Sequence, residues 1–446
     1  MTRFRALLRW TLAASVSFAF TGALAGCGWF GAKEAPPLPG ERMAVLLFDS
    51  ELKADPQVAE QAVRLPRPVV NPDWAMAGGR PSHAMHHLAL GDMPGVVWRA
   101  DAGTGSDDNA VLTAPPIVAS GKVFTIDAEG MVSAFDAGNG NRLWQVETAP
   151  EGENSAVVGG GLGYNNGRIY VGSGYAQVLA LSAENGEQVW RANMPAPVRA
   201  APTVSDGRVF IVTLDNQAIA LNAETGERLW GHAGISEVAG LVGGASPAVE
   251  RDVVVVPFSS GEIFALRAEN GRLLWTDNLT AVRRVDAISS LADIRGLPVI
   301  DREIVLAVSH SGRMAAVDRR IGARLWEKDI GGTQMPWVAG DYVFVVTNDA
   351  ELVALTRKEG YIRWIARLPR FEDEEDREDP IFWSGPVLAG DRLIVAGSHG
   401  EAMSVSPYTG EVLGRFELPD GVSISPVVAD NTLYILTDAA ELLALR

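Results

Sequence analysis

Short apolar runs separated by turn residues alternate along the chain from about residue 115 to the C-terminus. One unit contains a proline-bearing run at 201–204, a second run at 208–213 and a third at 218–222. Such short runs, rich in Val, Ile and Phe, are typical of strands, and the units lack the spacing of an amphipathic helix. The pattern therefore predicts an all-β protein.

Each unit ends in a turn with glycine, and a tryptophan follows four residues after that glycine. The tryptophans are Trp144, Trp190, Trp230, Trp275, Trp326 and Trp364, and Gly414 stands at this place in the last such copy. Glycine permits the positive φ of a tight hairpin turn. Tryptophan supplies a large apolar ring with one N–H to satisfy. We expect these rings to pack against the neighbouring unit as part of the core.

One unit of four short strands in about 45 residues has the length of a propeller blade. Repeats begin near residues 115, 159, 201, 245, 296, 336, 385 and 425, which makes eight. The last repeat lacks its fourth strand, and an unmatched strand with Trp98 lies before the first repeat. The sequence therefore predicts an eight-bladed β-propeller closed by pairing the N-terminal strand with the C-terminal blade, which leaves fewer exposed edges.

The first 26 residues have the organisation of a signal peptide. Three arginines precede an apolar stretch that is shorter than the roughly 20 residues of a membrane-spanning helix. Residues 24–27 read Leu-Ala-Gly-Cys, which resembles the lipobox of bacterial lipoproteins. The resemblance implies lipid attachment at Cys27 and, because Gly28 follows, anchoring in the outer membrane facing the periplasm. The alternative is an ordinary signal peptide with a chance cysteine.

Composition narrows the possible partners and domains. The net charge is −17, which repels a phosphate backbone on average, so no nucleic acid is expected. The single cysteine excludes an intramolecular disulfide and a cysteine-based metal cluster. Residues 27–70 are rich in proline and are expected to tether the lipid to the propeller body, residues 71–446.

Two further clusters carry charge or potential ligands. His83, His86 and His87 could suggest a metal site, but the surrounding sequence lacks a carboxylate pattern, so a loop capping the propeller is the favoured interpretation. The acidic insert 371–379 is expected to be a solvated loop, with an interaction tail or weak cation site as alternatives. We expect no catalytic and no metal-binding residues.

The phrase at residues 220–230, Ala-Leu-Asn-Ala-Glu-Thr-Gly-Glu-Arg-Leu-Trp, resembles the quinoprotein-type propeller repeat. Together with the lipobox, eight such repeats resemble the BamB family of outer-membrane assembly lipoproteins. The resemblance implies a non-enzymatic scaffold without a cofactor, a monomer within a hetero-complex, that binds the periplasmic domains of the barrel-inserting subunit.

The same resemblance implies partner-binding residues in two segments. Val198 and Arg199 match one family segment, and Leu291 and Asp293 match the other, where Arg295 stands in place of a second acid. Both segments precede the first strand of a blade, so we expect them exposed on one face of the ring. The alternative for each charged residue is a solvated loop charge.

Two other functions remain open at this point. One is a quinone-dependent dehydrogenase, which, as the resemblance implies, needs a calcium ion, a base carboxylate and often a vicinal disulfide that a single cysteine cannot form. The other is a periplasmic module that binds glycan or cell wall.

Overall fold

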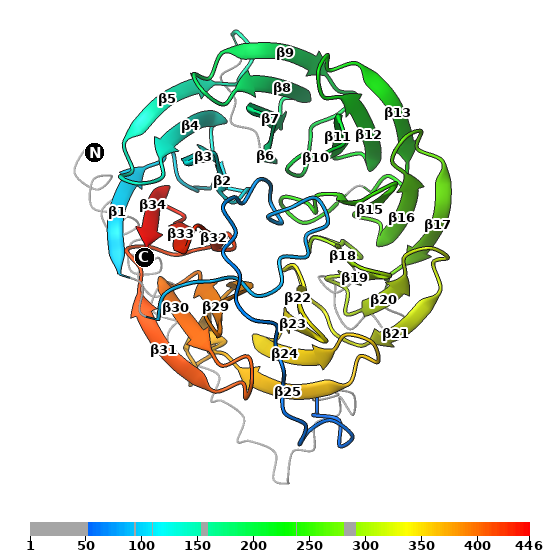
Figure 1. Ribbon diagram of the computed structural model, residues 1–446, viewed down its shortest axis with the longest axis vertical. Helices are drawn as coiled ribbons and strands as arrows, with labels where there is room; N and C mark the ends of the chain where they lie inside the picture. Colours follow the sequence, from blue (N-terminus) through cyan, green and yellow to red (C-terminus); the bar gives the residue numbers. More distant parts are fainter. Residues whose placement is uncertain (1–51, 93–94, 109, 153–158, 238, 281–290) are drawn as a thin grey trace, which may run out of the picture. The chain divides into compact units, whose positions relative to one another are not determined.

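The computed structural model describes residues 52–92, 95–108, 110–152, 159–237, 239–280 and 291–446. In these residues the strands form eight four-stranded antiparallel sheets, arranged as blades around a ring (Figure 1). The predicted eight-bladed β-propeller is confirmed. The predicted signal peptide and lipid-attachment residue Cys27 lie outside the described residues. Within the described ranges there is no helix long and apolar enough to cross a membrane.

Each of the first four blades is a meander of consecutive strands. Blade 1 comprises β2 (Ile117–Ala119), β3 (Lys122–Ile126), β4 (Met131–Asp136) and β5 (Arg142–Glu147). Blade 2 comprises β6 (Gly160–Asn165), β7 (Arg168–Ser173), β8 (Gln177–Ser182) and β9 (Gln188–Asn193). Blade 3 comprises β10 (Thr203–Ser205), β11 (Arg208–Val212), β12 (Gln217–Asn222) and β13 (Arg228–Ala233). Blade 4 comprises β14 (Ala248–Glu250), β15 (Val253–Pro257), β16 (Glu262–Arg267) and β17 (Leu273–Asn278).

The next three blades repeat this order, and the eighth joins both ends of the propeller. Blade 5 comprises β18 (Val299–Asp301), β19 (Ile304–Val308), β20 (Met314–Asp318) and β21 (Arg324–Lys328). Blade 6 comprises β22 (Trp337–Ala339), β23 (Tyr342–Val346), β24 (Glu351–Thr356) and β25 (Ile362–Arg367). Blade 7 comprises β28 (Trp383–Ala389), β29 (Arg392–Gly397), β30 (Glu401–Val405) and β31 (Val412–Glu417). Blade 8 comprises β32 (Val427–Ala429), β33 (Thr432–Leu436), β34 (Glu441–Leu445) and β1 (Val96–Asp101).

The ring closes as the sequence predicts. Strand β1 pairs antiparallel with β34, so that Trp98 lies opposite Ala444 and Asp101 opposite Glu441. The last blade therefore receives its outer strand from the N-terminal end of the propeller.

The tryptophans pack between blades. At seven junctions the indole lies on the glycine of the next blade's last turn, and its Nε1–H donates to a backbone carbonyl of that turn. At Gly140, for example, an added Cβ would lie 2.6 Å from Trp98 Cε3, and the Trp98 Nε1 donates to Ala137 O at 3.0 Å. The glycine thus serves both the turn and the close approach of the ring.

Burial explains the two kinds of strand. The second and third strands of a blade are apolar on both faces because both faces contact other blades, as in β11 and β12. The outer strand alternates instead, as in β13, where Trp230 is buried between exposed neighbours. The hydrophobic clusters accordingly lie between adjacent blades, for example between blades 1 and 2 around Phe124.

Residues 52–92 lie against the propeller. Asp55 N donates to Ile362 O of blade 6 at 2.7 Å, and Val58 and Val63 are buried. Residues 69–92, which we call the capping segment, then run across the end of the ring axis (Figure 1). Trp74 stacks there on Trp337, with 6.2 Å between ring centroids.

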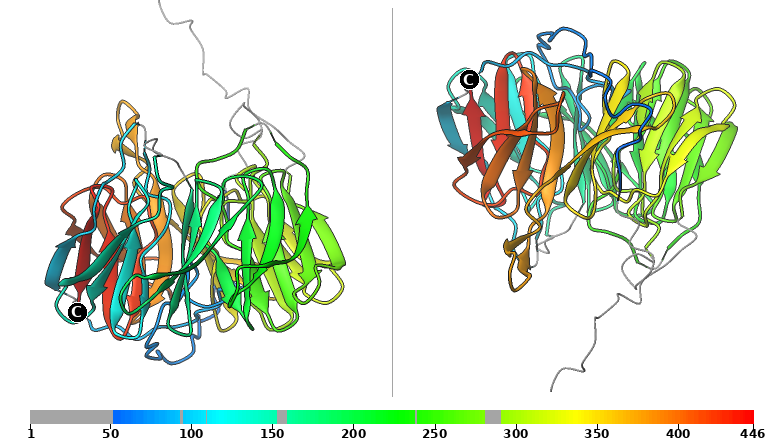
Figure 2. Two further views of the ribbon diagram at one scale, coloured as in Figure 1. Left: turned by 90° about the horizontal axis from the view of Figure 1, so that it is seen from above. Right: turned by 90° about the horizontal axis from the view of Figure 1, so that it is seen from below.

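The acidic insert is a β-hairpin and not an irregular loop. Its strands are β26 (Phe371–Asp373) and β27 (Glu378–Pro380), and their side chains are largely exposed. The hairpin projects from the face opposite the capping segment (Figure 2). It remains solvated, as the sequence indicates, although its backbone is regular.

Candidate functional site

The four residues expected to bind a partner lie in loops on the face opposite the capping segment. Arg199 lies between β9 and β10, and Asp293 lies before β18. The structure brings the two side chains together: Arg199 Nη2 donates to both carboxylate oxygens of Asp293 at 3.0 Å. This ion pair joins segments that are 94 residues apart.

Further bonds extend the ion pair across neighbouring blades. Arg199 Nη2 donates to Gly243 O at 3.3 Å, and Asp293 Oδ2 accepts from Leu241 N at 2.8 Å. Asn216 stands beside Arg199 and accepts from Ser259 Oγ at 3.0 Å. We call these residues the buried loop network. It connects turns of blades 3 and 4 to the loop before blade 5.

The expectation that these charged side chains are exposed is wrong. Arg199 is 4% exposed and Asp293 is 0% exposed. Val198 is also fully buried, and Leu291 is half-buried. The alternative of solvated loop charges fails for the same reason. The two segments lie on one face, as predicted, but burial depends on which loops meet, and a single segment does not reveal that.

The side chains that do reach solvent here were missed by sequence reasoning. Leu214, Ile235 and Val242 are 56%, 59% and 52% exposed. We call them the apolar loop surface. The buried loop network holds their segments together, because Asn216 Nδ2 donates to Ile235 O at 2.6 Å and Arg199 contacts Gly243 O. The sequence did contain one sign of this exposed surface. Leu214 is an apolar residue in the turn Leu214-Asp-Asn-Gln, where a polar residue would be expected.

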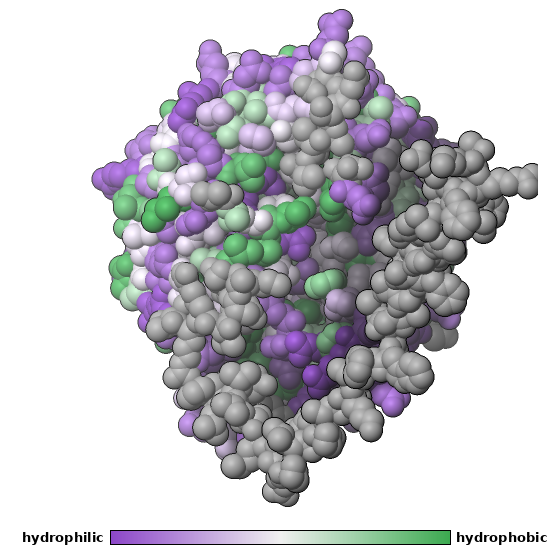
Figure 3. All heavy atoms as spheres, turned by 180° about the vertical axis from the view of Figure 1, so that it is seen from behind, coloured by the Kyte–Doolittle hydropathy of each residue, from purple (hydrophilic) through white to green (hydrophobic). Residues whose placement is uncertain are grey.

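Most other exposed large apolar side chains of the described chain lie one or two to an outer strand, on seven of the eight outer strands, for example Leu143, Val189 and Leu229. Single exposed apolar residues are normal, whereas a group of them on one face marks an interaction site. Figure 3 shows this face, where hydrophobic groups gather on the side of blades 3 and 4.

The ring axis leaves little room for a cofactor. The axial cavity has a volume of about 90 Å³, and its lining from Ala77 to Ser425 contains no carboxylate among the described residues. Arg295 is the charged residue in this lining, and its burial lowers the pKa of the guanidinium. The described residues also contain no cluster of His, Cys, Asp and Glu that could hold a metal ion. These residues do not fit a calcium-bound quinone.

The three histidines bind three different partners. His83 Nδ1 is 2.7 Å from Pro298 O, and His87 Nδ1 is 2.7 Å from Pro66 O. His86 Nε2 lies 3.5 Å from Asp301. Burial lowers the pKa of His83 to about 4 and also lowers the pKa of His86. His83 and His86 therefore contact the start of blade 5, and His87 connects the capping segment to the preceding residue 66.

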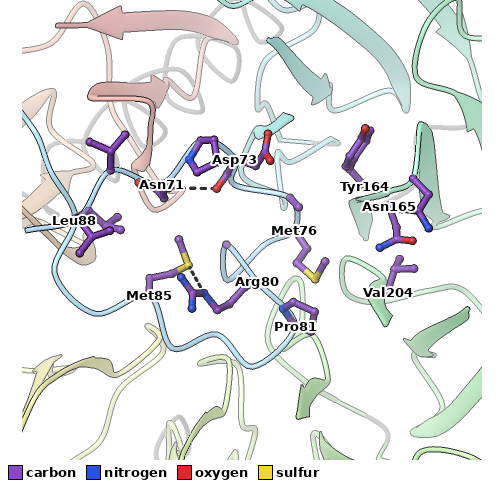
Figure 4. Close-up of a pocket in the computed structure, with 16 residues that line it drawn as sticks. Asn71, Asp73, Met76, Arg80, Pro81, Met85, Leu88, Tyr164, Asn165 and Val204 are labelled. Carbon is purple, nitrogen blue, oxygen red and sulfur yellow. Dashed lines mark hydrogen bonds between the residues drawn. The ribbon is translucent and has the colours of Figure 1, made fainter. Parts of the chain in front are cut away.

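A second hollow, of about 470 Å³, lies where the capping segment meets blades 2 and 3 (Figure 4). Arg80 Nε donates to Met85 Sδ at 3.3 Å, and Asn71 Nδ2 donates to Asp73 O at 3.2 Å. Both bonds join residues of the capping segment and stabilise its conformation. Neither bond places an acid beside a base across the hollow.

Comparisons with known proteins identify a family. The profile described as "Outer membrane protein assembly factor BamB" matches residues 73–158 and 128–366. The protein of that name from Salmonella typhimurium is 30% identical over 347 residues, covering 77% of this chain and 86% of the relative. The one from Xanthomonas campestris is 32% identical over 356 residues, covering 78% and 85%.

Solved structures agree on the fold. The crystal structure of BamB from Moraxella catarrhalis superposes with a TM-score of 0.66 at 19% identity, covering 79% of this chain and 99% of that one. Quinohemoprotein alcohol dehydrogenase from Comamonas testosteroni gives 0.65 at 16% identity, covering 87% and 83%. At these identities the likeness extends to the propeller fold alone, which enzymes and assembly factors share.

Proposed function

This chain belongs to the family of outer membrane protein assembly factor BamB, and we propose that it is a non-enzymatic subunit of the outer-membrane β-barrel assembly complex. It is anchored by lipid on Cys27 and faces the periplasm. Its propeller binds the periplasmic domains of the barrel-inserting subunit.

One observation carries this proposal: three exposed apolar side chains, Leu214, Ile235 and Val242, stand on loops of one propeller face. Loops on a rigid scaffold are frequent binding elements, and apolar groups of this kind favour protein partners. On the opposite face the capping segment crosses the end of the ring axis and bonds to the inner strands of several blades (Figure 1). The axial cavity, with its small volume and lack of carboxylates, argues against the alternative of a quinone-dependent dehydrogenase.

Arg199 and Asp293 act in this proposal as positioning residues. They are buried, so they do not touch the partner directly, but they hold the segments that carry Ile235 and Val242. Removing one member of a buried ion pair leaves an unpaired charge and costs about 3–5 kcal/mol. Arg199→Ala should therefore reduce stability as well as partner binding.

The decisive experiment separates contact from stability. In Ile235→Asp/Val242→Asp, two exposed side chains change, so unfolding should shift by no more than about 0.5 kcal/mol per site. Capture of the barrel-inserting subunit from detergent-solubilised membranes should fall at least about tenfold, because charges would enter an apolar interface. Leu325→Asp, on the outer strand β21 of blade 5, is the matched control and should capture the subunit normally. If the folded double variant captures the subunit as well as the unaltered protein does, the apolar loop surface is not the binding site.

A further inference from the structure

One junction between blades differs from the seven that contain tryptophan. Strand β31 of blade 7 carries Gly414 where the indole would stand, and an added Cβ there would meet nothing within 4 Å. The next blade explains the difference. In blade 8 the strands β34 and β1 come from opposite ends of the propeller and share no connecting turn, so a tryptophan would have no turn glycine to cover.

The missing ring leaves a cavity of about 560 Å³, which we call the seam groove. Its apolar lining includes Ile394 of β29, Phe416 of β31, and Leu433, Leu443 and Leu445 of blade 8. Small-molecule and side-chain pockets are typically apolar cavities of roughly 300–1,000 Å³ with a few polar groups. The seam groove has this size and character.

Arginines supply the polar groups. Arg99 pairs with Glu441 at 3.2 Å, and Arg415 pairs with Glu401 at 3.1 Å. Both arginines are half exposed, and such surface pairs exchange partners at little cost. Arg392 donates to the carbonyls of Gly91 and Asp92, and burial lowers the pKa of its guanidinium.

The mouth of the groove carries charges of both signs. Three arginines and two acids, Asp92 and Glu417, line it, and Glu441 and Glu401 pair with Arg99 and Arg415. A guanidinium can bind a carboxylate through two parallel hydrogen bonds. The groove therefore combines an apolar interior with two half-exposed arginines, at which a partner's carboxylate would replace Glu441 or Glu401.

We propose that the seam groove binds an extended peptide segment of a partner protein, which inserts an aromatic side chain and pairs a neighbouring carboxylate with Arg99 or Arg415. An indole occupies the equivalent place at the seven other junctions. The groove is flanked by β31 and β1, outer strands that each pair with one neighbour among the described residues, so each has an edge to which an extended chain can add. The site lies between blades 7 and 8, apart from the apolar loop surface, and does not depend on the proposed function.

The test uses the full-length protein in detergent and fluorescence polarisation of a labelled peptide, Asp-Thr-Trp-Thr-Asp. We expect saturable binding with a dissociation constant below about 1 mM. Gly414→Trp places an indole in the groove and should weaken binding at least tenfold. Leu229→Trp, which adds the same ring to the outer strand β13 of blade 3, is the matched control and should bind as the unaltered protein does.

Two altered peptides test which peptide side chains bind, and a substitution of an exposed groove residue tests the groove without unfolding the protein. A peptide with alanine in place of tryptophan should bind at least tenfold more weakly, and one with lysines in place of both aspartates about fivefold more weakly. Leu413→Glu, a substitution of an exposed residue at the groove, should repel the acidic peptide without unfolding the protein. The proposal is overturned if no saturable binding is found below about 1 mM, if both groove variants bind normally, or if the alanine peptide binds equally well.

Discussion

The contact between each turn glycine and the preceding blade's tryptophan can be measured with one substitution and a control. Gly226, between β12 and β13, has φ +75°, and an added Cβ would lie 2.7 Å from Trp190 Cε3. Gly207, between β10 and β11 of the same blade, has φ +71°, but an added Cβ would meet nothing within 4 Å. Gly226→Ala and Gly207→Ala therefore share the backbone cost and differ in the contact.

The expected magnitudes follow from these geometries. Alanine in the left-handed region costs about 1–2 kcal/mol, and the smaller entropy of the unfolded chain returns about 0.4–1 kcal/mol. Gly207→Ala should therefore lower the free energy of unfolding by about 1 kcal/mol or less. Gly226→Ala adds a clash with a packed ring, and overpacking of this kind costs a further 1–3 kcal/mol or so.

Urea unfolding, followed by tryptophan fluorescence, gives both values if the slope with denaturant is unchanged. A double-mutant cycle identifies the cause. Trp190→Ala alone should cost about 3–5 kcal/mol, and in that background Gly226→Ala should cost no more than Gly207→Ala does. Equal costs for the two glycines in the unaltered protein, or an unchanged cost without Trp190, would refute the packing argument.

Three other predictions follow from the lipobox, the buried histidine and the axial cavity. Cys27→Ser should keep the melting temperature of the propeller but move the protein from the membrane to the soluble fraction, and an unchanged membrane fraction would count against acylation as the anchor. Because His83 is buried with a pKa of about 4, below its ordinary 6.5, its contribution to stability is complete above pH 6.5 and is lost as the pH falls towards 4. Denaturant titrations at pH 7 and pH 4 measure how much the free energy of unfolding falls with pH. In His83→Gln this fall should be about 3 kcal/mol smaller than in the unaltered protein. An equal fall in both proteins would contradict the lowered pKa of His83. Pyrroloquinoline quinone with calcium should not raise the melting temperature, although a true ligand at a hundredfold excess over its dissociation constant would add about 2.7 kcal/mol, so a saturable increase would revive the enzyme alternative.

The sequence by itself determined the architecture. The number of blades, their boundaries and the strand that closes the ring follow from a glycine turn and a tryptophan at a constant separation of four residues. These features are local, since turn conformation and strand periodicity depend on neighbouring residues in the chain. The missing tryptophan at Gly414 was also visible, although its meaning was not, because only the ring shows that β34 and β1 share no turn.

Only the tertiary structure decided which of the candidate residues are buried and which reach solvent. Arg199 and Asp293 carry charges that a sequence places in solvent, yet the ring brings their loops together and buries both as an ion pair. The sequence analysis assigned no role to the apolar residues Ile235 and Val242, and the structure exposes both on the same face. Burial arises from contacts between segments that are distant along the chain, and the free energy of burying a charge depends on whether such a contact supplies its partner.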